Sequence, residues 1–162
     1  MKMIDSFNVD HLHLERGIYV SRTDDVGNGI AVTFDIRMRK PYVDKPMTGR
    51  AMHTIEHIGA TWLRNQLNNI VYFGPMGCKT GFYLIIAQKA NTPITAIRIA
   101  PYVLQMFRFI SMYEGPIPGC SMKECGNSEY HDLDMAREYA DDFLEAWNEN
   151  KLHFEYEESN ED

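Results

Sequence analysis

The chain has 162 residues, of which 44% are hydrophobic and 24% charged, a balance typical of one folded domain with its own core. The formal net charge of −7 and the isoelectric point near 5.3 argue against nucleic acid or an anionic membrane as a partner, because both favour a basic protein face. No segment resembles a signal peptide or a membrane span, and the odd number of cysteines, three, favours reduced thiols. We therefore expect a cytoplasmic protein.

The first third of the chain predicts strands. Residues 6–15 show no regular period, and we interpret them as an extended arm. Residues 18–20 predict a short strand and residues 24–29 a turn. From residue 30 to residue 37, apolar and polar residues alternate, which is typical of a half-buried strand with Asp35 and Arg37 on one face.

A helix is expected after Pro46, with Thr48 as its N-cap. Its buried stripe is indicated by residues at spacings of three and four: Met52, Ile55, Gly59, Trp62 and Leu63. Two histidines lie at the edge of this stripe.

The second half of the chain predicts two strands and two helices. Residues 70–73 and 82–87 are strand candidates, the second in the middle of a sheet. Thr92-Pro93 predicts the start of a long helix toward Tyr113, with a kink or restart at Pro101. A last helix is expected over residues 132–150, followed by an acidic tail at residues 155–162. We predict a single α+β domain over residues 1–162, with an antiparallel β-sheet and helices packed on one face.

The clearest chemical motif is His53-x-x-Glu56-His57 on the first predicted helix. Residues three and four apart share a helical face, so both imidazoles could bind one ion with Glu56 beside it. This order is the inverse of the zincin motif and places a carboxylate where it could move protons near a Lewis acid. The same five residues would also suit an ordinary amphipathic helix with two solvated histidines.

Cysteines supply candidates for a third ligand and a reactive group. Cys78 lies in a glycine-rich turn, where its thiol could be exposed, and the adjacent Lys79 would favour the thiolate. Cys125 could complete a His2Cys set with an open fourth position, the pattern of a catalytic metal site. Cys120, five residues away, is the alternative ligand. His131 could support the metal, but its place at a helix start favours a structural role.

Several motifs, taken together and in order, closely resemble the S-ribosylhomocysteine lyase (LuxS) family from about Ser6 to the final helix. They are Ser6-Phe7, Asp10-His11, Phe34-Asp35-Ile36-Arg37, His53-Thr54-Ile55-Glu56-His57, Gly74-Pro75-Met76-Gly77-Cys78-Lys79-Thr80-Gly81-Phe82-Tyr83, Cys125-Gly126 and His131-Asp132-Leu133. Many family members carry an acidic residue just before the Gly-Pro-Met motif, where this chain has Tyr72 and Phe73.

This resemblance implies a fold, a site and a reaction. The fold resembles that of the inverzincin peptidases. A metal is expected on His53, His57 and Cys125, with Cys78 and Glu56 as the acid–base pair. The native metal would be Fe2+, with Zn2+ or Co2+ as possible substitutes. Substrate-binding residues are expected at Ser6, His11, Arg37 and Arg64, within a homodimer whose active sites are shared.

The substrate implied by the family is S-ribosylhomocysteine. A thioether is a poor leaving group, so the carbonyl would first migrate from C1 to C3 of the sugar through enediolates that the metal stabilises. β-Elimination would then give homocysteine and 4,5-dihydroxy-2,3-pentanedione, the precursor of autoinducer-2, a quorum-sensing signal.

Two alternatives remain at this stage. An inverzincin-like metallopeptidase would use Glu56 as general base, would need a carboxylate ligand such as Glu129 or Glu138, and would not need Cys78. A non-enzymatic module stabilised by metal would have a closed site with four protein ligands.

Overall fold

A computed structural model describes residues 9–91 and 93–157. The predictions for Ser6, for Thr92 and for residues 158–162 of the acidic tail lie outside the described residues.

Within those ranges the chain forms four strands and three helices. In chain order they are β1 (Gly17–Val26), β2 (Gly29–Arg37), α1 (Gly49–Gln66), β3 (Ile70–Pro75), β4 (Gly81–Lys89), α2 (Ala96–Ser111) and α3 (Leu133–Asn148).

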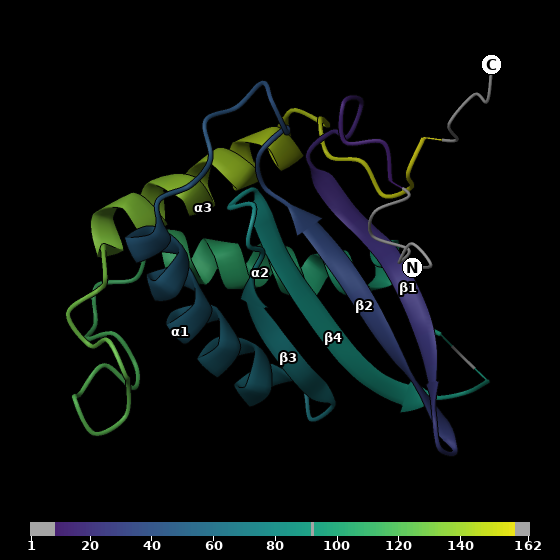
Figure 1. Ribbon diagram of the computed structural model, residues 1–162, viewed down its shortest axis with the longest axis horizontal. Helices are drawn as coiled ribbons and strands as arrows, with labels where there is room; N and C mark the ends of the chain where they lie inside the picture. Colours follow the sequence, from purple (N-terminus) through teal and green to yellow (C-terminus); the bar gives the residue numbers. More distant parts are fainter. Residues whose placement is uncertain (1–8, 92, 158–162) are drawn as a thin grey trace, which may run out of the picture.

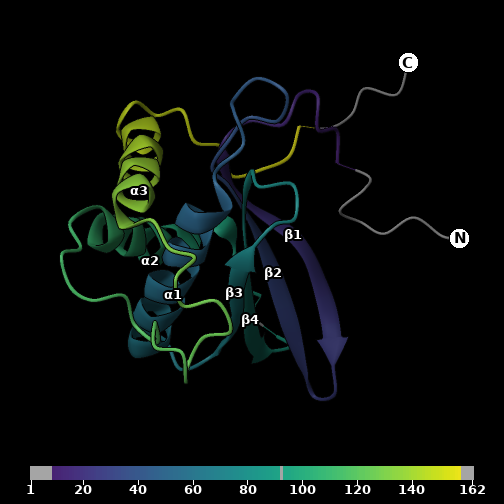
Figure 2. The ribbon, with the colours of Figure 1, turned by 60° about the vertical axis from the view of Figure 1, so that its left-hand side comes forward.

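The strands form one antiparallel sheet in the order β1-β2-β4-β3. All three helices cover the same face of this sheet (Figures 1 and 2). The hydrophobic core lies between the two layers and includes Phe34 and Ile36 of β2, Phe82 of β4, Met106 of α2 and Phe143 of α3. The predicted α+β fold and the interior position of β4 are confirmed.

Strand β2 is more deeply buried than its alternating pattern predicts. Residues 32–37 are buried on both faces of the sheet. Because side chains alternate along a strand, Asp35 and Arg37 face away from the helices. The C-terminal segment covers them there, and the Tyr156 hydroxyl donates to Oδ2 of Asp35 at 3.3 Å. The half-buried interpretation of this strand was therefore wrong at its second half.

The start of α1 confirms the predicted cap. Thr48 has an extended backbone, and its side chain accepts a hydrogen bond from the N–H of Ala51. Thr48 therefore supplies an acceptor for one of the N–H groups that a helix start leaves unpaired.

Helix α2 differs from its prediction at two points. It begins at Ala96 with Thr95 at the N-cap, not at Thr92-Pro93. It also continues through Pro101 without a restart. The buried face that α2 packs into the core outweighs the one hydrogen bond that a proline removes.

The N-terminal region also departs from the prediction. Residues 11–13 form a turn instead of an extended arm, and Leu14 is buried. The strand expected at residues 18–20 continues to Val26 because it pairs along the whole of β2. Among the described residues, helices long and apolar enough to cross a membrane are absent.

Candidate metal centre and active site

His53 and His57 lie one turn apart on α1, with ring centroids 4.5 Å apart. Nδ1 of His53 lies 2.8 Å from the carbonyl oxygen of Tyr130, and Nδ1 of His57 lies 2.7 Å from that of Pro118. A carbonyl can only accept, so each Nδ1 carries the proton. The Nε2 lone pair of both rings is thus free to bind an ion, as is usual for metal-ligating histidines.

The loop between α2 and α3 brings Cys125 to these histidines. The sulfur of Cys125 lies 3.5 Å from Nε2 of His53 and accepts a hydrogen bond from the N–H of Asn127. Cys120, the alternative ligand, instead directs its thiol to the carbonyl oxygen of Ser128 at 3.2 Å.

His131 completes a cluster of four possible ligands. One donor atom from each of His53, His57, Cys125 and His131 lies within 4.8 Å of the others. The His131 ring stacks on His53 with centroids 4.1 Å apart, and its Nδ1 lies 3.2 Å from Oγ1 of Thr54. Burial, followed by the nearby His53 and His57, lowers the pKa of His131 to about 4.

This donor set fits a divalent transition metal. Neutral imidazole nitrogens and a thiolate suit zinc, iron or cobalt, whereas calcium and magnesium prefer oxygen ligands. The cluster contains a thiol in place of the carboxylate ligand that a peptidase of this type requires. The geometry therefore favours a site of the His2Cys type over the peptidase alternative.

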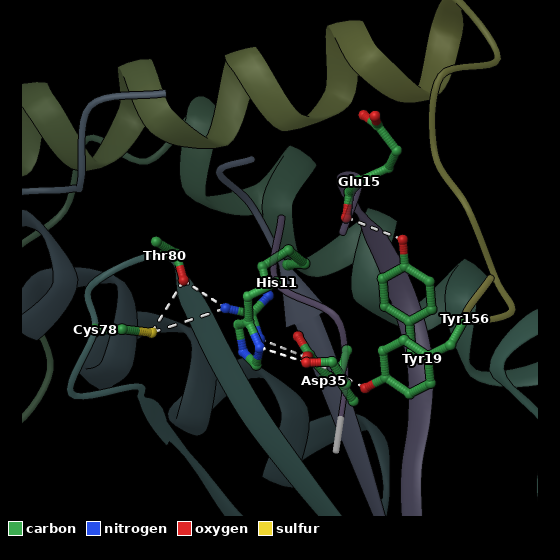
Figure 3. A network of polar contacts seen from close by, with 9 residues as sticks. His11, Glu15, Tyr19, Asp35, Cys78, Thr80 and Tyr156 are labelled. Atoms are coloured by element: carbon green, nitrogen blue, oxygen red, sulfur yellow. Dashed lines mark hydrogen bonds and ion pairs between the residues drawn. The ribbon is translucent and has the colours of Figure 1, made fainter. Parts of the chain in front are cut away.

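Cys78 lies in the turn between β3 and β4, and its thiol is exposed, as the sequence predicts. The sulfur lies 3.0 Å from Oγ1 of Thr80 and 3.8 Å from a guanidinium nitrogen of Arg37 (Figure 3). The cation that contacts the sulfur is thus Arg37, rather than the Lys79 that the sequence indicates.

Backbone hydrogen bonds fasten this turn to the segment that leads into α1. The N–H of Met47 donates to the carbonyl of Lys79 at 2.9 Å, and the N–H of Met38 donates to that of Thr80 at 3.0 Å. His53 lies in the second turn of α1, and the turn that carries Cys78 is hydrogen-bonded to Met47, two residues before that helix. Glu56 is half-buried three residues after His53, so the two side chains extend from the same face.

Arg37 is held by a buried ion pair. Its guanidinium donates to Asp35 at 2.6 Å and to Thr80 at 2.5 Å, and both charged side chains are almost fully buried. Burial opposes the charge of Arg37, but Asp35 and Cys78 outweigh it and raise the pKa of Arg37. The Arg37 guanidinium is therefore a fixed positive charge beside the Cys78 sulfur.

Comparison with known proteins assigns the chain to a family. The family model described as S-Ribosylhomocysteinase (LuxS) matches residues 4–154. The S-ribosylhomocysteine lyase of Finegoldia magna is 46% identical over 91% of this chain and 93% of its own length. Those of Desulfotalea psychrophila and Phocaeicola vulgatus are 47% and 43% identical, over 86% and 95% of this chain and 87% and 98% of their own lengths. The chain belongs to the LuxS family.

The LuxS resemblance assigns substrate contacts to residues that the structure separates. Burial raises the pKa of Asp35, and Arg37 and, more weakly, His11 oppose that rise. Figure 3 shows His11 between Asp35 and Cys78, so His11 and Arg37 belong to the Cys78 side of the site. Arg64 lies in the last turn of α1, where it donates to the carbonyl of Val71 at 3.2 Å. Arg64 lies eleven positions after His53, about 16 Å along the helix axis.

Sequence reasoning understated two parts of this LuxS site. The sequence allows His131 to support the metal but favours a structural role, and in the structure its Nε2 is buried without a hydrogen-bond partner among the described residues. Thr80 was not singled out, although it contacts both Cys78 and Arg37. Two features of the sequence could have drawn attention to these residues. His131 directly precedes Asp132, the N-cap of α3, and Thr80 follows Cys78 by two residues.

Proposed function

We propose that this chain is an S-ribosylhomocysteine lyase, which cleaves S-ribosylhomocysteine to homocysteine and 4,5-dihydroxy-2,3-pentanedione. The proposal is carried by two observations, the His–His–Cys cluster that includes two histidines of α1, and the exposed Cys78 on a turn hydrogen-bonded to the segment just before α1. Membership of the LuxS family supports it. So does the similarity to proteins named S-ribosylhomocysteine lyase, which extends over most of the length of both chains.

In this proposal His53, His57 and Cys125 hold the metal. We infer Fe2+ as the native ion, with Zn2+ or Co2+ as substitutes, since imidazole and thiolate ligands accommodate all three. When bound, the metal supplies Lewis-acid polarisation of the sugar oxygens. Hydrogen bonds to the carbonyls of Tyr130 and Pro118 keep both imidazoles oriented for this task.

Cys78 is the proposed proton carrier at the sugar carbons. The buried Arg37 guanidinium lies 3.8 Å from the Cys78 sulfur, and the exposed residue is open to substrate. It would remove the proton from C2 and return it to C1, which moves the carbonyl from C1 to C2. The same exchange between C3 and C2 would bring the carbonyl to C3.

Glu56 is the proposed acid–base group for the sugar oxygens. It lies beside the ligand His53 on the same helical face, so it can exchange protons with hydroxyls near the metal. Once the carbonyl reaches C3, the proton at C4 becomes acidic. Its removal with Glu56 assisting would expel the homocysteine thiolate from C5.

We further propose a cytoplasmic homodimer with shared active sites. The LuxS resemblance implies that the two subunits share their active sites, and Arg64 lies about three helical turns from His53. As a substrate-binding residue it would act in the site of the partner subunit. Ser6, outside the described residues, is kept as a proposed substrate contact with His11 and Arg37.

The test is to incubate the iron-loaded protein, without oxygen, with S-ribosylhomocysteine and to titrate the released thiol. Homocysteine should appear with the wild-type protein and fall to background with Cys78→Ala or Glu56→Gln at equal iron content. Cys120→Ser serves as the matched control because that thiol is bonded to Ser128, and it should retain activity. Peptidase activity that survives Cys78→Ala, with no thiol release by the wild type, would refute the proposal.

A further inference from the structure

The last described residues of the chain form a segment that is held against β1. The N–H of Ile18 donates to the carbonyl of His153 at 2.9 Å, and the N–H of His153 donates to the carbonyl of Arg16 at 3.0 Å. A Cβ atom at Gly17 would collide with the His153 carbonyl oxygen, so glycine at this position allows the close approach. The match to the LuxS family model ends at residue 154 and does not cover the residues that follow.

Tyr156 is the residue by which this segment reaches the polar network around Arg37. Its ring lies flat on that of Tyr19, with centroids 4.5 Å apart and planes inclined by 7°, which fixes where its hydroxyl lies. The two hydroxyls have different partners. That of Tyr19 donates to the backbone carbonyl of Glu15 at 2.9 Å, and that of Tyr156 donates to Oδ2 of Asp35 at 3.3 Å (Figure 3).

The Asp35 carboxylate that accepts from Tyr156 also holds Arg37. Its Oδ2 accepts from Nη2 of Arg37 at 2.6 Å, and its Oδ1 is buried without a hydrogen-bond partner in the described part of the chain. Burial raises the pKa of Asp35, whereas Arg37, Tyr156 and, more weakly, His11 oppose this rise. Tyr156 thus supplies one of the two hydrogen bonds that this carboxylate accepts from side chains of the described residues.

Arg37 extends this connection to the exposed thiol. While Nη2 is bonded to Asp35, Nη1 donates to Oγ1 of Thr80 at 2.5 Å and lies 3.8 Å from the Cys78 sulfur. The donors of a planar guanidinium form a rigid fork, so the position of the Asp35 oxygen helps to determine where Nη1 lies. A single carboxylate oxygen therefore joins the Tyr156 hydroxyl to the guanidinium beside Cys78.

We propose that Tyr156 is a positioning residue for Cys78, an inference that rests on the role of Cys78 in the proposed function. Its hydroxyl holds the Asp35 carboxylate in the orientation that places Arg37 beside the thiol. Without that hydroxyl, the carboxylate keeps only its bond to Arg37 and can turn within its buried site. Arg37 is then held less firmly beside the Cys78 sulfur.

The test measures, as a function of pH, the rate at which iodoacetamide alkylates Cys78 in the metal-loaded protein, followed by mass spectrometry. Tyr156→Phe keeps the stacked ring and removes only the hydroxyl. It should slow alkylation at neutral pH by about threefold and move the rise of the rate to higher pH, because the cation beside the sulfur is held less firmly. Tyr19→Phe is the matched control, since the hydroxyl that it removes is bonded to Glu15, and it should leave the rate–pH curve unchanged.

A second measurement tests whether Tyr156 acts through Arg37. In an Arg37→Gln background, Tyr156→Phe should cause no further slowing, because the hydroxyl has no cation left to position. All rates are compared at the same interval below the unfolding temperature of each variant, so that a general loss of stability does not enter the comparison.

Three results would each overturn the inference: equal rate–pH curves for the wild type and Tyr156→Phe, equal slowing by Tyr19→Phe and Tyr156→Phe, or undiminished slowing by Tyr156→Phe in the Arg37→Gln background. The alkylation assay contains no substrate, so its outcome is separate from that of the lyase assay. A lyase-active protein with coincident curves would refute only the positioning role of Tyr156. The predicted curves in a protein that releases no homocysteine would refute only the lyase proposal.

Discussion

The three cysteines of the chain have different surroundings, which explains why one of them is suited to act as the proton carrier. The Cys120 thiol donates a hydrogen bond to a backbone carbonyl, and Cys125 lies against His53. Cys78, in contrast, is exposed beside Arg37. Arg37 cannot turn away, because Asp35 and Thr80 hold its guanidinium in the sheet. The charge beside the Cys78 sulfur is therefore preorganised.

Arg37→Gln should slow the reaction of Cys78 with iodoacetamide by about tenfold or more at neutral pH, since the thiolate loses its adjacent cation. The measurement is the alkylation rate in the metal-loaded protein, followed by mass spectrometry of the peptide that contains Cys78. Thermal unfolding is recorded in parallel, because Asp35 loses its buried partner.

Lys79→Gln is the matched control for this experiment. Lys79 follows Cys78 in sequence but has its backbone in the left-handed region, with φ at 60°, and is exposed. It should change the alkylation rate little. A larger effect from Lys79→Gln than from Arg37→Gln would contradict the role given to Arg37.

At the level of elements, α1 carries the two ligand histidines, and its N-terminal cap fixes where the helix begins. Thr48→Ala should destabilise the protein by about 1 kcal/mol, because the N–H of Ala51 loses its acceptor. Urea unfolding measures this change. Thr95→Ala is the control at the start of α2, where the threonine makes no side-chain cap bond, and it should cost clearly less. Equal losses would mean that the Thr48 hydrogen bond is not the cause.

The C-terminal segment gives the protein a stability that depends on pH. It pairs with the start of β1 through Gly17 and His153, and it stacks Tyr156 on Tyr19 with centroids 4.5 Å apart. Burial, followed by the nearby Asp35 carboxylate, raises the pKa of both tyrosines. Near pH 10 the unfolded chain loses these protons while the folded chain keeps them.

Stability should therefore fall as the pH rises above about 10. The urea midpoint should drop more between pH 9 and pH 11 for the wild type than for Tyr156→Phe, which removes one of the buried hydroxyls. Tyr42→Phe is the control, because Tyr42 is exposed. Equal slopes for the wild type and Tyr156→Phe would show that Tyr156 ionises alike in both states.

Elements were predictable from sequence where local pattern and tertiary packing agree. Thr48 and the stripe around Ile55 determine α1, and a continuous apolar run determines β4. The start of α2 was missed because Thr92-Pro93 is a good local signal, whereas the helix begins at Ala96. The burial of Asp35 was missed because a segment more than 100 residues later covers it.

At the scale of the whole molecule, the fold assembles the site from distant parts of the chain. His53 and His57 were predictable as a pair because one helix presents both. The approach of Cys125 and His131 depends on how the loop before α3 returns to α1, and no local period encodes that path. Chemistry alone made both Cys120 and Cys125 candidate ligands, and the choice of Cys125 came only from the resemblance to LuxS.

Shared active sites predict complementation between two impaired variants. In a mixed dimer of Cys78→Ala with Arg64→Ala, one site would contain Cys78 from one protomer and Arg64 from the other, and would be complete. Refolding the variants together should restore lyase activity toward about a quarter of the wild-type value, since half of randomly formed dimers are mixed. Activity no greater than the sum of the separate variants would contradict the shared site.

The central claim is that the Cys78 thiol moves protons between the sugar carbons beside the metal centre. Carbon NMR of 13C-labelled S-ribosylhomocysteine tests it most directly, because a carbonyl that moves from C1 to C2 gives a new ketone signal. With equal metal content, Cys78→Ala should form this ketone at least about 100-fold more slowly than the wild type. Ketone formation by Cys78→Ala at the wild-type rate would contradict the claim.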